Sequence, residues 1–150
     1  MKSMWLTAAF LIALMECSQA EAQSLVGKTV HATIVGPQSN IPIHIYISRN
    51  NEIFDYETNQ GESVAKQGGF ATKNGGVTKH PDGATVTTSF SGNTITELAR
   101  TRDGWTKMSL TVRGDNDCSL SWSSSSPEQA AKARATMSVT SCRITQGPMQ

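Results

Sequence analysis

The chain has 150 residues, of which 13 are Lys or Arg and 12 are Asp or Glu. Hydrophobic residues make up 37% of the chain and charged residues 17%. Nearly balanced charge argues against nucleic-acid binding, which usually requires a basic excess gathered on one face. The hydrophobic fraction is too high, and the net charge too low, for a chain that is disordered throughout. The length excludes two ordinary domains once any targeting segment is removed, so we expect one domain.

Residues 1–22 have the layout of a secretory signal peptide. Lys2 supplies a basic start, residues 4–15 carry no charge, and Ala20-Glu21-Ala22 gives the small-x-small pattern of a cleavage site. An apolar segment of this length would rise only about 18 Å as a helix, well short of the roughly 30 Å hydrocarbon core of a bilayer. We therefore predict cleavage after Ala22, with Ala20 as the competing site. The protein would then be exported to the periplasm or medium, with no stable membrane anchor.

The cysteines predict a disulfide bond. Of the three cysteines, Cys17 lies in the predicted signal peptide, which leaves Cys118 and Cys142 as a single pair in an oxidising compartment. Closing a loop of about 25 residues would stabilise the fold by roughly 3.5 kcal/mol in the chain-entropy model. Two free buried thiols are the alternative. A zinc site is a poorer interpretation, because neither a CxxC nor an HxxxH spacing accompanies the cysteines.

The first part of the mature chain, from residue 23, alternates between apolar and polar residues, as β-strands do. Ile41, Ile43, Ile45 and Ile47 form the clearest strand, and a strand through residues 30–34 precedes it across a turn at residues 36–40. Because Pro42 cannot donate to a ladder, we expect it at a sheet edge, a strand start or a bulge. Asn50-Asn51 makes a turn into a short third strand, Glu52–Tyr56.

Residues 57–83 interrupt this rhythm with many glycines and few apolar anchors. A stretch of this length without regular structure is uncommon inside a compact domain. We favour a weak strand around Gly69–Thr72, flanked by loops. The alternative is a mobile functional loop.

The remaining chain predicts further strands and one helix. The strands are expected at Ala84–Phe90, Thr94–Arg100, Trp105–Arg113, Cys118–Trp122 and Thr136–Thr145. Before the last strand, Ser126 is a capping residue and Pro127 a favoured first helical residue. Turn signals every eight to twelve residues are typical of a sandwich or barrel. We therefore predict an all-β domain over residues 23–150, mostly antiparallel, with seven or eight strands and one short helix before the last strand.

The three histidines are the main candidates for chemistry, and the strand register constrains two of them. If Ile34 pairs with Ile41 across the first hairpin, His31 and His44 lie on the outer face, opposite each other. Two imidazoles can hold a metal only weakly, so solvated surface histidines are the favoured interpretation. His80 precedes a turn sequence and is interpreted as a loop residue. We expect no catalytic residue, no metal site and no cofactor, and no binding residue can be named.

A layout-level resemblance accompanies this pattern. The signal peptide, Ser24-Leu25-Val26-Gly27-Lys28 at the opening of the first strand, and the late Cys-helix-Cys segment look like small exported proteins of alphaproteobacteria whose function is unassigned. The resemblance implies export. It offers no catalytic residue and no ligand that could be carried over to this chain.

Three functions follow as hypotheses, and the architecture discriminates between them. The leading hypothesis is a non-enzymatic exported protein that binds a protein or glycan through surface loops on a rigid scaffold. The first alternative is a lipocalin-like carrier of a small apolar ligand, which an enclosed apolar cavity of several hundred Å³ would favour. The second alternative is a hydrolase or hydrolase inhibitor, which a cleft joining His80 to a carboxylate would favour. We do not expect nucleic acid to be a partner.

Overall fold

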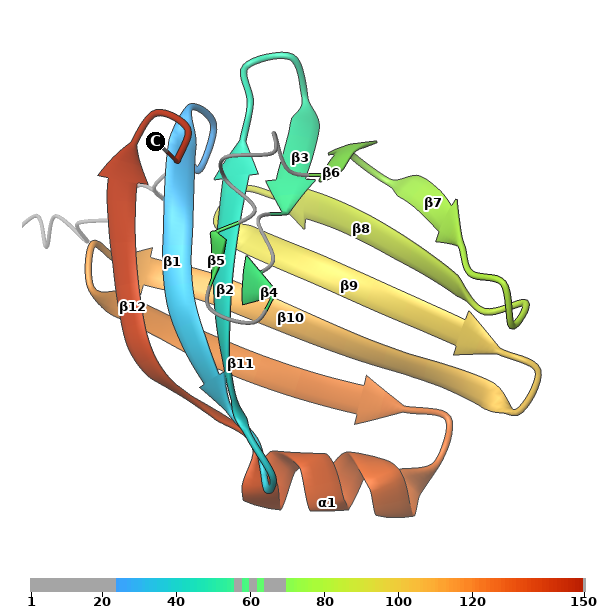
Figure 1. The fold of residues 1–150 in the computed structure, drawn as a ribbon. Helices are drawn as coiled ribbons and strands as arrows, with labels where there is room; N and C mark the ends of the chain where they lie inside the picture. The colour runs from blue at the N-terminus through green and yellow to red at the C-terminus, as the bar shows by residue number, and fades with distance from the viewer. Residues whose placement is uncertain (1–23, 56–57, 60–61, 64–69, 150) are drawn as a thin grey trace, which may run out of the picture.

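The computed structural model describes residues 24–55, 58–59, 62–63 and 70–149, so the predicted signal peptide lies outside the described residues. The described residues form twelve strands and one helix (Figure 1). In chain order these are β1 (Lys28–Val35), β2 (Asn40–Ile47), β3 (Glu52–Asp55), β4 (Thr58–Asn59), β5 (Glu62–Ser63), β6 (Phe70–Lys73), β7 (Gly76–Lys79), β8 (Thr85–Ser91), β9 (Thr94–Thr101), β10 (Gly104–Gly114), β11 (Asp117–Ser124), α1 (Pro127–Thr136) and β12 (Ser138–Gln146).

The strands form two antiparallel five-stranded sheets and a small two-stranded ribbon. The first sheet has the order β12-β1-β2-β3-β6, the second has the order β11-β10-β9-β8-β7, and β4 pairs with β5. The strands of the first sheet run steeply across those of the second (Figure 1). The sheets do not close into a barrel, so the predicted all-β fold is confirmed as a sandwich. The strands outnumber the predicted seven or eight, because short strands form in the glycine-rich segment.

The first hairpin has the register predicted from its alternation. Ile34 pairs with Ile41, and His31 pairs directly with His44. Pro42 is the third residue of β2. The pairing of β2 with the described part of β3 ends at Ile45 and Asp55, so it does not reach Pro42. The proline therefore lies near a strand start, one of the positions expected for a residue without an N–H group.

The glycine-rich segment contains the predicted weak strand, β6, and three short strands that were not predicted, β4, β5 and β7. β6 pairs with β3, which confirms a strand at the expected place, whereas β7 pairs with the edge of β8. Asn74 connects the two sheets at the turn between β6 and β7: its backbone N–H donates to the Asn51 carbonyl at 3.0 Å, and its side-chain amide exchanges two hydrogen bonds with the Phe90 backbone. Apolar periodicity does not reveal β7, because backbone pairing rather than burial holds it: Val77 is 57% exposed.

A small apolar core lies between the two sheets at one end of the sandwich. The buried residues that form it are Leu25, Val30, Ala32, Ile47, Ile53, Ile95, Leu110 and Val112. A disulfide joins Cys118 to Cys142, with 5.7 Å between their Cα atoms. This bond confirms the predicted pair and excludes the alternative of two free thiols. Because β11 and β12 are edge strands of different sheets, the disulfide ties the two layers together.

Helix α1 begins where the sequence predicts. Ser126 adopts an extended conformation and its side chain accepts a hydrogen bond from the Gln129 N–H at 3.3 Å, while Pro127 is the first helical residue. Of its side chains only Ala130 is buried, so the helix contributes little to the core. Within the described residues, no helix is long and apolar enough to cross a membrane.

Candidate ligand-binding cleft

A cleft opens between the two sheets where the core ends. In the first sheet the inward positions run from Val30 opposite Ile45, in the core, to Ile34 opposite Ile41 at the end of the hairpin. In the second sheet they run from the buried pair of Ile95 with Leu110 toward the turn between β9 and β10. Beyond the core the inward side chains no longer fill the space between the layers. The same alternation that builds the core therefore lines the cleft.

The cleft has a volume of about 570 Å³ and is mainly apolar. Its apolar lining includes Ile34, Ile41, Ile43, Ala99, Met108, Trp122 and Met137. Trp122 and Met108 come from directly paired positions of β11 and β10, and Met137 caps the end of α1. Volumes of roughly 300–1,000 Å³ with predominantly apolar walls are typical of small-molecule sites.

Ile41 marks the mouth of the cleft. Its side chain has the inward parity of its strand, yet 48% of its surface is exposed. An apolar side chain at an inward position normally loses most of its exposure to the opposite layer. At Ile41 the side chain lines the cleft instead, so the cavity is open to solvent on this side.

Two carboxylates line the otherwise apolar cleft. Asp55 lies on β3 opposite Ile45, and Glu97 lies on β9 opposite Met108. Among the described residues that line the cleft, none is basic. Sequence analysis missed both acids, although each lies two residues after a core residue of its own strand. Asp55 therefore shares a face with Ile53, and Glu97 shares a face with Ile95. A charged residue at an inward position of a strand was the signal.

The two strand histidines meet on the outer face of the first sheet, as predicted. Their Nδ1 atoms are 2.8 Å apart, so one ring donates a hydrogen bond to the other, and Nε2 of His31 is 2.8 Å from the Thr145 hydroxyl. Burial lowers the pKa of His31, and the neighbouring His44 and Arg143 lower this pKa further. Burial, and then the Arg143 charge, also lowers the pKa of His44. They are hence a half-buried, hydrogen-bonded pair rather than two independently solvated side chains.

The third histidine lies apart from any catalytic arrangement in the described part of the chain. His80 is exposed, and its backbone closes the turn before β8 through hydrogen bonds to Ala84 and Gly83. Within the described residues, no hydrogen bond joins its imidazole to a carboxylate, and no three His, Cys, Asp or Glu side chains gather as metal ligands. The pairing of His80 with a carboxylate that would favour a hydrolase is therefore not found among these residues.

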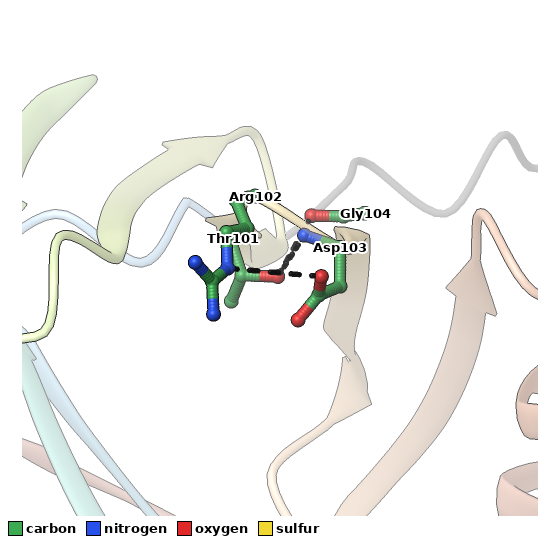
Figure 2. Close-up of polar contacts among 4 residues, drawn as sticks. All are labelled: Thr101, Arg102, Asp103 and Gly104. Atoms are coloured by element: carbon green, nitrogen blue, oxygen red, sulfur yellow. Dashed lines mark hydrogen bonds and ion pairs between the residues drawn. The ribbon is translucent and has the colours of Figure 1, made fainter.

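The turn between β9 and β10 borders two smaller hollows. Figure 2 shows Thr101 at the start of this turn, and the Thr101 hydroxyl accepts a hydrogen bond from the Asp103 N–H at 3.2 Å. The exposed side chains of Arg102 and Asp103 form an ion pair at 3.9 Å. Trp105 follows this turn on the outward side of β10, half-buried, and lines a surface hollow of about 320 Å³. This agrees with the parity of Trp105, which differs from that of Met108 and Leu110.

The described residues thus offer one apolar cleft with acidic groups and one polar cluster on the opposite side of the first sheet. Comparison of the chain with protein-family models, curated proteins and solved structures found no match. An apolar cavity with a few polar groups can bind and orient a small molecule.

Proposed function

We propose that this is an exported, non-enzymatic binding protein that holds a small amphipathic molecule in the cleft between its sheets. The single observation that carries the proposal is the mainly apolar, half-open volume of about 570 Å³. Binding of a protein or glycan through surface loops was the leading hypothesis from sequence. No feature of the described loops favours it over the cleft, so the carrier function takes its place.

The signal-peptide layout of residues 1–22 and the disulfide support the export part of the proposal. A disulfide persists in oxidising compartments and is rare in the cytosol. Mass spectrometry of the protein purified from its own host tests export directly. A mature chain that begins at Gln23 or Glu21 is expected, and a chain that retains residues 1–22 would contradict export.

The cleft chemistry defines the class of ligand. Burial of an apolar body against Ile43, Met108 and Trp122 contributes roughly 25 cal/mol for each Å² removed from water. The charged side chains in the described lining are Asp55 and Glu97, which are both acidic. Because a carboxylate has several acceptor sites, a polar end that is cationic or donates hydrogen bonds is favoured.

A neutral fluorescent probe tests occupancy of the cleft. N-Phenyl-1-naphthylamine gains fluorescence in apolar surroundings, so it should bind the wild-type protein saturably. Ile41→Gln should raise its Kd by about tenfold, since a polar amide replaces an apolar wall. Because Ile41 is 48% exposed, this variant should fold normally.

The matched control is Val77→Gln, which changes an apolar side chain of similar exposure (57%) that does not line the cleft. Its probe affinity should equal that of the wild type. Equal losses in the two variants, or saturable binding that neither variant changes, would contradict the cleft as the site.

The charge preference is tested with amphiphiles that differ in headgroup, each below its micelle concentration. Dodecyltrimethylammonium should displace the probe at lower concentration than dodecyl sulfate. Glu97→Gln should reduce this preference, because it removes one negative charge from the lining. Tighter binding of dodecyl sulfate would contradict the assigned ligand class while leaving the cleft itself in place.

A further inference from the structure

Three nitrogen-bearing side chains form a row across the outer face of the first sheet. His31 of β1 pairs with Arg143 of β12 on one side and with His44 of β2 on the other. Directly opposed residues of antiparallel strands lie on the same face, so all three side chains project away from the ligand cleft. A shallow cavity of about 420 Å³ lies over this row, and Asn116 and Ser141 also line it.

The hydrogen bonds within the histidine pair limit how many protons it holds. The contact between the two Nδ1 atoms requires one ring to donate and the other to accept. When both imidazoles are protonated, every ring nitrogen is a donor, and this contact loses its acceptor. A doubly protonated pair therefore needs an external acceptor that satisfies both N–H groups.

The surroundings supply positive charge and donors. Arg143 is exposed and permanently charged, and no acidic side chain lines the cavity in the described part of the chain. Two other titratable residues lie nearby. Tyr46 is the next outward residue of β2 after His44. Asp115 lies in the turn between β10 and β11, and its backbone carbonyl accepts a hydrogen bond from the Ile144 N–H at 3.0 Å. An oxyanion can accept hydrogen bonds from a guanidinium and from both imidazolium rings at once.

We propose that His31, His44 and Arg143 form an acid-dependent binding site for a sulfate or phosphate group, either free or esterified to a sugar. Near neutral pH the pair is uncharged and only Arg143 attracts the anion. Protonation in acid adds positive charge and donors, and the bound oxyanion replaces the acceptor that the pair loses. Anion binding and proton binding are thus linked, and each strengthens the other. This site is independent of the cleft proposed above.

Inorganic sulfate is the probe for the first experiment, since its charge does not change over the pH range used. Ring resonances of the histidines are followed by NMR during sulfate titration at constant ionic strength, at about pH 5.5 and about pH 7.5. Saturable shifts of His31 and His44 are expected at the lower pH, with affinity at least about tenfold weaker at the higher pH. His80, exposed in its turn, should not respond.

Variants separate a site from general salt effects. Arg143→Gln should weaken sulfate binding at the lower pH by about tenfold. Arg100→Gln, which removes an exposed arginine from the other sheet, should leave it unchanged. Glucose 6-sulfate as a second probe distinguishes the sources: tighter binding than sulfate indicates a sugar ester, and equal or weaker binding a free anion.

Several results would overturn the proposal. These are equal shifts at His80, affinity that does not depend on pH, or binding that survives Arg143→Gln unchanged. Saturable broadening of His31 and His44 by Zn²⁺, in the absence of any response to sulfate, would instead identify the pair as a weak metal site.

Discussion

At the scale of single residues, the histidine pair has a consequence for stability. The pKa of His31 and of His44 is lowered in the folded protein, first by burial, from the ordinary value of 6.5. As the pH falls below 6.5, the unfolded chain takes up protons that the folded protein does not yet accept. Folding therefore loses free energy in a window that opens at 6.5 and ends at the lowered pKa values.

We predict that the free energy of unfolding decreases as the pH falls through this window, when measured by urea denaturation in a buffer without sulfate or phosphate. Replacing both histidines, in His31→Gln with His44→Gln, should flatten this part of the pH profile. The control His80→Gln should retain the wild-type slope, since its residue is exposed. A double variant with an undiminished slope would contradict the account of the pair.

At the scale of structural elements, the turn between β9 and β10 depends on one glycine. Gly104 has a φ of +146°, a conformation that L side chains rarely adopt. A methyl group at this position would also collide with the Ser125 side chain. That side chain has little freedom to move away, because its hydroxyl accepts a hydrogen bond from the Trp105 N–H at 2.9 Å.

Gly104→Ala should lower the free energy of unfolding by more than about 1 kcal/mol in chemical denaturation. Gly83→Ala is the matched control: Gly83 has a φ of +86°, but a methyl group there meets nothing within 4 Å. Its cost should be smaller, since only the backbone strain remains. Equal costs for the two substitutions would show that the contact with Ser125 has no effect.

Most elements could be predicted because their inward residues are apolar and alternate. Ile34 and Ile41 set the register of the first hairpin, which in turn placed His31 opposite His44. The edge strand β7 could not be found in this way, since the burial of its side chains is slight. The cleft was also beyond prediction. Alternation shows that Ile41 points inward, but not how far away the opposite sheet lies.

At the scale of the whole molecule, the two sheets are held together at one end and separate at the other. The disulfide between Cys118 and Cys142 joins the edge strands of the two sheets. The buried core residues, among them Leu25 and Val112, fill the space beside it. The cleft occupies the other end. The disulfide and the core therefore hold the two layers together beside the cleft.

Replacing both cysteines, in Cys118→Ala with Cys142→Ala, should lower the free energy of unfolding by about 3.5 kcal/mol, the chain-entropy value for a loop of this length. The wild-type protein in a reducing agent should show a similar loss in a denaturant titration. Ala131→Ser, an exposed change on α1, serves as the control and should have little effect. A double variant as stable as the wild type would mean that packing alone holds the sheets together.

Methionine methyl groups provide the most direct test of the cleft as a binding site. Met108 and Met137 line it, whereas Met149 lies outside it and serves as an internal reference. With ¹³C-labelled methionine methyls, titration with dodecyltrimethylammonium should shift the Met108 and Met137 signals saturably and leave Met149 in place. Signals that stay unchanged at saturating amphiphile, or shifts of equal size at all three methyls, would contradict binding between the sheets.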